Sequence, residues 1–170
     1  MPTDAITLLK ADHKKVKGLF KDFENAQDKR AKKKIVTEAL LELKIHAALE
    51  EEIFYARVRR NVGKDIMNEA DEEHHVAKLL IAELESMGGS ESHYDAKFTV
   101  LAENVRHHIK EEEGEMLRKA RGLKIDFEDL GQQMLARRQD LLTNGFPLVG
   151  EEVMVARSKG KGDSPAKAAG

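Results

Sequence analysis

Apolar residues recur along most of the chain at alternating steps of three and four positions. This spacing places them on one face of an α-helix, because an α-helix has about 3.6 residues per turn. Glycines and prolines stand mainly between these stretches, where helices are expected to end. The pattern predicts an all-α protein with long helices over residues 3–27, 29–60, 64–87 and 93–120 and a shorter helix over residues 126–142.

Four long helices joined by short turns favour an antiparallel up-down-up-down four-helix bundle with a short fifth, C-terminal helix. The chain has 170 residues, a length that suits one domain with a proper core. We expect residues 1–143 to form this domain. Residues 144–170 are expected to form a disordered basic tail, because their last part, ARSKGKGDSPAKAAG, lacks apolar periodicity.

The apolar face of each long helix is interrupted only by histidine and glutamate. In the first helix the face consists of Ile6, Leu9, His13, Val16 and Phe20, and the other three helices follow the same rule. The six interruptions are His13, His46, Glu50, His74, His108 and Glu112. A lone core histidine is more often hydrogen-bonded to a neighbour than bound to a metal. Four helices interrupted in the same way favour one shared site.

These six residues are predicted to lie in one layer of the bundle. In an up-down-up-down arrangement, the starts of the first and third helices share one end with the ends of the second and fourth. All six positions fall roughly 15 Å from that end, at the helical rise of about 1.5 Å per residue. His46 with Glu50 and His108 with Glu112 are i, i+4 pairs, so the members of each pair share one face of their helix.

A buried layer of this kind needs a positive charge. Two glutamates in an apolar core must be protonated, paired with a cation or bound to a metal, and no lysine or arginine lies on the apolar faces. Four imidazoles and two carboxylates are too many for one tetrahedral zinc, but they suit two metals with bridging carboxylates. Mixed nitrogen and oxygen ligands favour iron, with manganese or zinc as substitutes. The alternative is a metal-free network of histidine–glutamate hydrogen bonds.

Composition narrows the functional classes. The chain has no cysteine, which excludes disulfides, thiolate metal sites and cysteine nucleophiles. Charged residues make up 35% of the chain but the net charge is only −2, so the charges, including KRAKKK at 29–34, favour solvated helix faces over nucleic-acid binding. Without a signal-peptide core or membrane span, we expect a cytoplasmic protein that binds neither nucleic acid nor membranes and exists as a monomer or weak oligomer.

Four motifs resemble those of the hemerythrin-like proteins, also called HHE cation-binding domains. They are DHKKVKGLF around His13, KIHAALEEEIFY around His46, EEHHVAKLLIAELE around His74 and HHIKEEEGEML around His108. The resemblance runs from about Ile6 to Leu142. It implies an antiparallel four-helix bundle around a non-haem di-iron centre with an oxo or hydroxo bridge. The four histidines would be terminal ligands, and Glu50 and Glu112 would bridge the irons.

One departure from this family concerns the second iron. Oxygen-carrying hemerythrins place another histidine four residues after the one in the third helix, and here that residue is Lys78. The resemblance therefore implies an open or differently filled position at one iron. Tyr55 is an additional candidate ligand on its chemistry, since phenolate binds ferric iron well. A regular helix, however, turns Tyr55 about half a turn away from His46, and only a local bulge would reverse this.

Three functional hypotheses follow from the sequence. The first is a di-iron protein that binds or reacts with dioxygen, peroxide or nitric oxide in an oxygen or stress response, for example by catalase-like decomposition of peroxide. The second is a non-catalytic iron-binding or iron-sensing module, and the third is a metal-free structural bundle. A ferritin-like site is set aside, because it needs a Glu-x-x-His pair on each of two helices and only Glu72-x-x-His75 fits. His75 and His107 are expected at the surface or just outside the layer.

Overall fold

The computed structural model describes residues 4–160, and all regular structure among them is helical. The all-α class expected from the sequence is thereby confirmed. The helical segments are α1 (Ala5–Asn25), α2 (Lys29–Leu49), η1 (Glu50–Phe54), α3 (Tyr55–Val62), α4 (Lys64–Glu85), α5 (Tyr94–Glu111), η2 (Glu112–Met116), α6 (Leu117–Arg121), α7 (Phe127–Asn144) and α8 (Gly150–Gly160).

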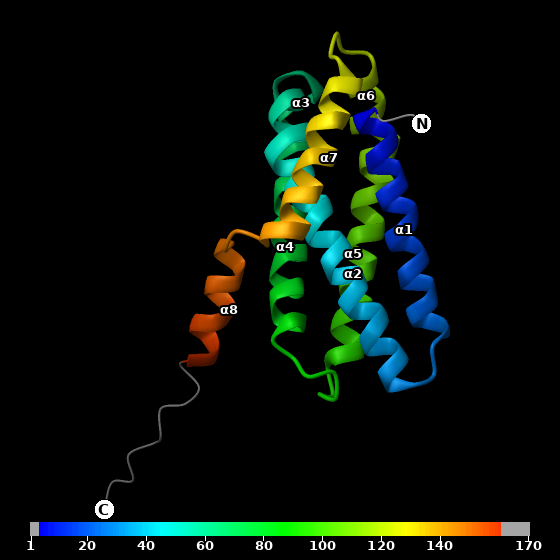
Figure 1. Ribbon diagram of the computed structural model, residues 1–170, viewed down its shortest axis with the longest axis vertical. Helices are drawn as coiled ribbons and strands as arrows, with labels where there is room; N and C mark the ends of the chain where they lie inside the picture. The colour runs from blue at the N-terminus through cyan, green and yellow to red at the C-terminus, as the bar shows by residue number, and fades with distance from the viewer. Residues whose placement is uncertain (1–3, 161–170) are drawn as a thin grey trace, which may run out of the picture.

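Four long helical runs lie side by side along the longest axis of the molecule (Figure 1). They are α1, then α2 continued by η1 and α3, then α4, and finally α5 continued by η2 and α6. Helix α7 packs against α1, α2 and η1, and α8 packs against α4. Helix α7 falls where the shorter helix over residues 126–142 was expected. Within residues 4–160, no helix is both long and apolar enough to cross a membrane.

Aspartate side chains begin three of these helices. The carboxylates of Asp4, Asp28 and Asp126 accept hydrogen bonds from the backbone N–H groups three residues further on, at 3.2, 2.9 and 2.9 Å. Such a cap pairs one of the N–H groups that a helix start leaves without a partner. Between α3 and α4, Gly63 has a φ of 116°, a left-handed conformation that favours glycine. This single residue lets the chain reverse direction without a loop.

The apolar core is divided into two clusters. One contains Leu9, Leu49 and Ala70, and the other contains Val16, Leu43 and Val105. On α1 the boundary falls between Leu9 and Val16, where His13 stands, and on α2 it falls between Leu43 and Ile45, directly before His46. The polar layer predicted from the sequence therefore lies between two apolar halves of the core.

Two π-helical turns interrupt the runs that were expected to be regular helices over residues 29–60 and 93–120. The turns η1 and η2 begin at Glu50 and Glu112, and each ends with a backbone N–H, that of Tyr55 or Leu117, bonded to the carbonyl five residues earlier. A π turn holds one more residue than an α turn, so the helix beyond it is rotated by about 100° relative to a regular helix. Both glutamates of the layer thus mark the start of a wider turn.

The C-terminal segment differs from the disordered tail expected over residues 144–170. Residues Gly150–Gly160 form α8, while residues 161–170 lie outside the described part of the chain. Few apolar contacts hold α8: only Glu151 and Val155 are buried on it. Glu151 Oε1 lies 2.7 Å from Nδ1 of His75, and Glu152 Oε1 lies 3.3 Å from Nζ of Lys44. Hydrophobic periodicity does not detect a helix that is anchored mainly by polar contacts.

Candidate metal centre

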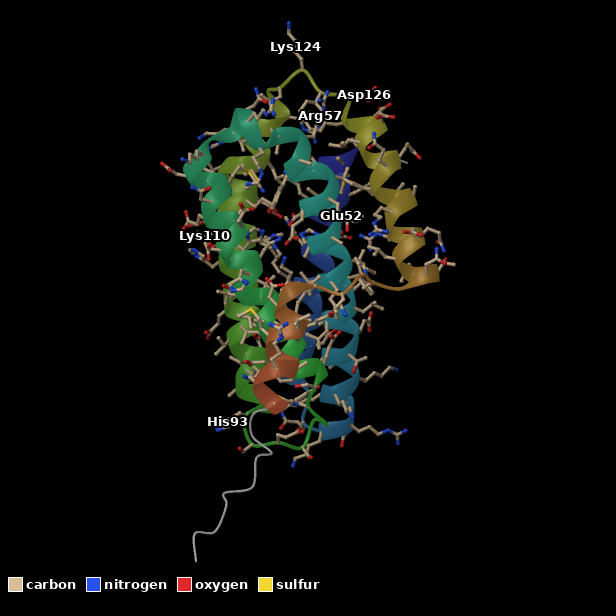
Figure 2. All side chains as sticks on the ribbon, turned by 90° about the vertical axis from the view of Figure 1, so that its left-hand side faces the viewer. Glu52, Arg57, His93, Lys110, Lys124 and Asp126 are labelled. Atoms are coloured by element: carbon tan, nitrogen blue, oxygen red, sulfur yellow. The ribbon has the colours of Figure 1, made fainter. Side chains whose placement is uncertain are left out.

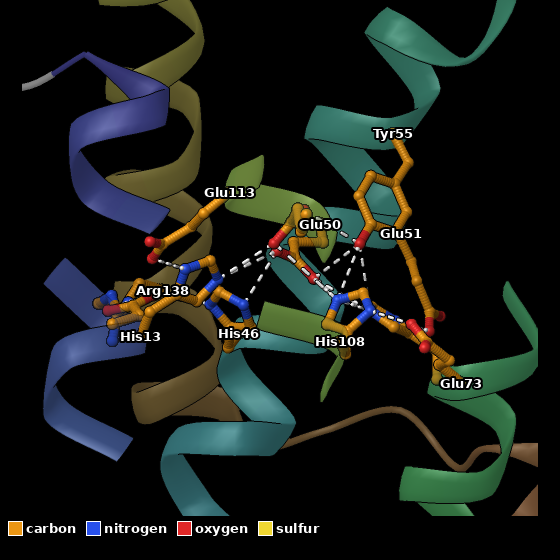
Figure 3. Close-up of polar contacts among 12 residues, drawn as sticks. His13, His46, Glu50, Glu51, Tyr55, Glu73, His108, Glu113 and Arg138 are labelled. Atoms are coloured by element: carbon orange, nitrogen blue, oxygen red, sulfur yellow. Dashed lines mark hydrogen bonds and ion pairs between the residues drawn. The ribbon is translucent and has the colours of Figure 1, made fainter. Parts of the chain in front are cut away.

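The six histidines and glutamates singled out from the sequence lie together between the two apolar clusters. Glu50, on η1, and His13, on α1, are fully buried, and Glu112, on η2, is 2% exposed. His46, His74 and His108, on α2, α4 and α5, are each 7% exposed. Figure 3 shows several of these side chains converging from their separate helices. The structure thus brings all six predicted residues into one buried layer.

Four of these residues converge on a common point. The ligand atoms of His13, His46, Glu50 and Glu112 all lie within 4.8 Å of one another. His46 Nε2 is 2.9 Å from Glu50 Oε1, and His13 Nε2 is 3.1 Å from Glu112 Oε2. These same four atoms are buried without a hydrogen-bond partner. Buried polar atoms are rarely left unpaired in proteins, so this quartet is suited to hold a cation.

A second group stands beside the first and shares Glu50 with it. The ligand atoms of Glu50, His74 and His108 lie within 4.8 Å of one another. Glu50 Oε2 is 3.0 Å from Nε2 of His74 and 3.8 Å from Nε2 of His108, while the two Nε2 atoms are 3.3 Å apart. The two oxygens of Glu50 therefore face different pairs of histidines, which is the arrangement a carboxylate needs to bridge two ions.

Each of the four histidines is fixed by a carboxylate on its outer nitrogen. The Nδ1 atoms lie 2.7 Å from Glu113 for His13, 3.2 Å from Asp12 for His46, 2.9 Å from Glu51 for His74 and 2.6 Å from Glu73 for His108. A carboxylate at Nδ1 holds the proton there and leaves Nε2 with its lone pair directed inward. All four rings are thereby prepared to act as ligands through Nε2.

Sequence reasoning did not identify these four carboxylates, although a simple signal was present. Each lies directly beside a layer residue: Asp12 and Glu73 precede His13 and His74, and Glu51 and Glu113 follow Glu50 and Glu112. Each, however, pairs with a histidine on another helix, so its partner could not be read from the sequence. Glu51 of the second helical run orients His74 of the third, and Glu113 of the fourth run orients His13 of the first.

Two basic side chains support this ring of carboxylates from outside. Arg138 of α7 donates two hydrogen bonds of 2.6 Å to the carboxylate of Asp12. Lys78 Nζ lies 2.9 and 3.0 Å from the two oxygens of Glu51. Lys78 occupies the position where the resemblance implied a missing histidine, and its ammonium faces Glu51 rather than the centre. The fifth helix and Lys78 therefore act on the layer through the carboxylates.

Tyr55 corrects the expectation drawn from a regular helix. The π turn η1 rotates this residue inward, and it is fully buried. Its hydroxyl oxygen lies 3.1 Å from Glu50 Oε2, 3.1 Å from Glu112 Oε1, and 3.3 Å from Nε2 of both His74 and His108. A phenol has one proton to donate, so it cannot satisfy all four atoms at once. Figure 3 shows the ring reaching the second group from above the layer.

Burial and neighbouring charges shift the pKa values of the residues in the layer. Burial lowers the pKa of His13, but the nearby carboxylates of Glu112 and Glu50 outweigh burial and raise it to about 9. Burial likewise lowers the pKa of His46, but the charge of Glu50 and the hydrogen bond that His46 donates to Asp12 raise it to about 10. Burial and the negative charges of Glu50 and Glu112 raise the pKa of Tyr55 well above its usual value. In the metal-free protein, protonated histidines thus balance the negative charge of the buried glutamates.

The remaining histidines lie outside the layer. His75 is directed to α8 through its contact with Glu151. His107 is exposed, and its Nε2 lies 3.3 Å from Glu73 Oε1 and 3.3 Å from Glu111 Oε1. His93 precedes α5 at the surface, at the lower end of the bundle in Figure 2. None of these three rings reaches the buried glutamates.

These features define a class of protein: an all-helical fold with a buried cluster of histidines and glutamates that can hold metal ions. Comparison with protein families gives the class a name: the model of the hemerythrin HHE cation binding domain matches residues 4–120. The chain belongs to this family, as its four histidine motifs implied.

Two relatives extend the comparison. A solved structure of a hemerythrin HHE cation binding domain-containing protein from Mycobacterium kansasii is 25% identical to this chain. It superposes with a TM-score of 0.69, covering 86% of this chain and 96% of that one. A protein of Nostoc sp. named a DNA nickase is 27% identical over 106 residues, which are 62% of this chain and 30% of that protein. The chain therefore spans less than a third of that relative, and most of the relative lies outside the match.

Proposed function

We propose that this protein holds two non-haem iron ions in the buried layer and uses them to bind or react with dioxygen, peroxide or nitric oxide. His13 and His46 would hold one ion and His74 and His108 the other, with Glu50 and Glu112 bridging the pair. The observation that carries the proposal is the set of four buried atoms without a hydrogen-bond partner, on His13, His46, Glu50 and Glu112. The ligand set of neutral imidazoles and carboxylates suits iron, with manganese or zinc as substitutes.

The proposed scaffold is an antiparallel up-down-up-down bundle of four helices with α7 as a fifth. Its support is the chain order of the long runs and the packing of α1 on α2 and of α4 on α5. In this bundle the layer receives residues from all four runs. Both glutamates stand where a π turn begins, so their carboxylates keep the inward direction of the preceding helix while the residues beyond them are rotated.

Tyr55 is proposed as a ligand of the second ion. Its hydroxyl oxygen stands within 3.3 Å of the His74 and His108 nitrogens, and the family's additional histidine is replaced by Lys78. Burial and the two glutamate charges keep the phenol protonated while no metal is bound. With a cation held there, the Tyr55 hydroxyl would lose its proton more readily, because a neighbouring positive charge stabilises the phenolate.

The chain's own residues prepare this chemistry. Iron supplies redox exchange with small oxygen or nitrogen species when it is bound. The carboxylates at Nδ1 keep the four imidazoles in the tautomer that binds metal. The apolar clusters on either side exclude water from the layer, which strengthens electrostatic interactions within it. Decomposition of peroxide in the manner of a catalase is one reaction that such a centre can support.

A non-catalytic iron sensor is the second candidate, and α8 favours it. Glu151 of α8 contacts both His75 and Lys78, and Lys78 in turn holds Glu51 at the Nδ1 of His74. A change in metal load at His74 could therefore be transmitted to α8. Comparing the affinity of a partner for iron-loaded and iron-free protein distinguishes a sensor from an enzyme, which turns over peroxide instead.

Iron stoichiometry tests the proposal. After anaerobic loading with ferrous iron and exposure to air, we expect about two irons per chain, from the two ligand groups, and the charge-transfer absorption of a bridged ferric pair. The His13→Ala, His74→Ala and Glu112→Ala variants should each lose iron, because each removes one proposed ligand.

His75→Ala and His107→Ala are the matched controls, since each removes a histidine beside a proposed ligand but outside the layer. They should retain nearly full iron loading. Equal losses in all five variants would show that iron is held elsewhere, and fewer than about one iron per fully helical chain would contradict the two-metal proposal.

A further inference from the structure

A small cavity touches the layer on the side away from Tyr55. It has a volume of about 40 Å³, and the four histidines His13, His46, His74 and His108 line it. The rest of its wall is largely aliphatic, including Val16, Leu43 and Val105. A water molecule needs roughly 10–15 Å³, so this inner cavity has room for a molecule of only a few non-hydrogen atoms.

A second cavity of about 80 Å³ lies outside the first, between α2 and α4. The two cavities share three lining residues, Ala47, Lys78 and Ile81. The wall between them is therefore one side chain thick. On the α2 side of this wall the shared residue is an alanine, Ala47, whose side chain is a single methyl group.

The outer cavity is covered by the strap (residues 146–152), by which we mean most of the link between α7 and α8 together with the first residues of α8. Phe146, Pro147 and Val149 of the strap line this cavity, as does Glu152. The ammonium of Lys44 lies 4.7 Å from the centre of the Phe146 ring. The same ammonium lies 3.3 Å from Oε1 of Glu152. Glu151, beside it, is held by His75. Figure 2 shows α8 lying against the half of the bundle below the layer.

We propose that dioxygen, peroxide or nitric oxide reaches the layer between α2 and α4, through the outer and inner cavities, and that the strap controls this route. The inference rests on the proposed function for its biological meaning, but not for its test. The strap lies at the surface and is held by the partly buried Phe146 and by the ion pairs of Glu151 and Glu152, and surface segments with few buried contacts open at lower free-energy cost than the core. The outer cavity is lined by two lysines, Lys44 and Lys78, and by three glutamates, Glu51, Glu52 and Glu152. Its lysines offset most of the negative charge, so the cavity repels small anions less than a wall of glutamates alone and does not hinder neutral molecules.

A competing opening lies between α4 and α5. It has a volume of about 30 Å³, and Ala70 and Met116 line it together with five glutamates, Glu69, Glu73, Glu111, Glu112 and Glu115. The negative charge of this opening repels anions. It also lacks the aliphatic wall of the inner cavity. The two routes end at different methyl groups, so they can be distinguished by experiment.

Dissolved dioxygen provides a probe that needs no iron. Dioxygen is paramagnetic and relaxes the methyl protons near which it resides, so the measurement can use metal-free or zinc-loaded protein. We expect the largest relaxation at the methyl groups of Ala47, Ala77 and Ile81. Ala39, which is fully buried but lines neither route, serves as the reference. Stronger relaxation at Ala70 and Met116, or equal relaxation at all buried methyls, would overturn the proposal.

Two matched substitutions on α4 test the route in the iron-loaded protein. Ala82 lines only the outer cavity and Ala70 only the competing opening, and both are buried, at 6% and 3% exposure. With azide as the probe, Ala82→Leu should slow binding by about tenfold, which corresponds to about 1.4 kcal/mol in the barrier. Ala70→Leu should leave the rate nearly unchanged.

Releasing the strap should have the opposite effect. Glu151→Lys places a positive charge against His75 and Lys78, and it should speed azide binding when the rate is compared per bound iron. Glu103→Lys, an exposed position on α5, is the control for the change in charge. Slower binding in Ala70→Leu than in Ala82→Leu, or no response to Glu151→Lys, would contradict the strap route. If no iron binds at all, the proposed function fails while the dioxygen measurement still decides the route.

Discussion

Glu50 is the residue on which the two halves of the layer depend. Its Oε1 faces His46 at 2.9 Å and its Oε2 faces His74 at 3.0 Å. Such a fully buried carboxylate is costly unless its charge is balanced, and both neighbours supply balance only when protonated or bound to metal. The charge of His46 and the surrounding hydrogen bonds overcome the effect of burial and hold the pKa of Glu50 well below its usual value. Glu50 therefore stays ionised and requires a positive charge beside it, from a protonated histidine or a metal ion.

Tyr55→Phe tests the second ion at the residue scale. The substitution keeps the ring and removes only the hydroxyl. We expect it to abolish a visible phenolate-to-iron absorption band and to weaken binding of one iron by about 10-fold or more. The measurement is an anaerobic iron titration followed by an absorption spectrum of the ferric protein.

Tyr94→Phe is the matched control, because Tyr94 is also buried but belongs to the apolar cluster that contains Val16. It should leave both the spectrum and the iron affinity unchanged. A wild-type ferric protein that lacks the band, with an iron affinity that Tyr55→Phe does not change, would mean that Tyr55 only donates a hydrogen bond to the glutamates.

At the scale of elements, regular helices were predictable and the π turns were not. The spacing of apolar residues predicted α1, α4 and α7, because the buried positions of these helices follow steps of three and four. A signal for η1 was nevertheless present: after Glu50 the buried residues Phe54, Val58 and Val62 recur at steps of four. A three-and-four continuation would have buried Arg57 and Arg60 instead.

That signal could not be decisive from sequence alone. A π turn weakens helical geometry locally, and it persists only when packing beyond it gains more than the turn loses. Here the gain is the burial of Tyr55 against the layer, which depends on helices distant in sequence. The same reasoning explains α8, whose anchors Glu151 and Glu152 find His75 and Lys44 only after the bundle has formed.

The reversal at Gly63 gives a prediction for stability at this scale. A side chain at a φ of 116° is strained, so Gly63→Ala should lower the free energy of unfolding by about 1–3 kcal/mol. Gly18→Ala is the control, because Gly18 lies within α1 with nothing within 4 Å of an added Cβ. It should raise the free energy of unfolding by about 0.5–1 kcal/mol. Urea unfolding of both variants measures the difference, and a neutral Gly63→Ala would mean that the turn relaxes.

For the whole molecule, acidity and metal compete for the same nitrogens. In the metal-free protein the pKa values of His13 and His46 are about 9 and about 10, against an ordinary value of 6.5. A raised pKa in the folded state contributes stability that is complete below 6.5 and is lost as the pH rises through 9 to 10. The metal-free protein should therefore become less stable across this interval.

Metal binding should show the opposite dependence. Iron or zinc requires neutral imidazoles, so each ion displaces protons, and its affinity should rise with pH over the same interval. Urea unfolding of metal-free protein and proton release on addition of zinc measure the two effects. Metal-free stability that does not change between neutral and alkaline pH would contradict the charged histidine–glutamate layer.

The division of the core into two apolar clusters has a consequence for the life of the protein in a cell. The clusters are separated by a layer of ionisable groups, and metal ions held in that layer would join them more firmly than its histidine–glutamate contacts do. Without metal each half would open more easily and expose the chain to proteases. Occupancy stabilises the closed form by mass action. Iron supply would then set how long each molecule survives, and its abundance would follow the iron available when it was made.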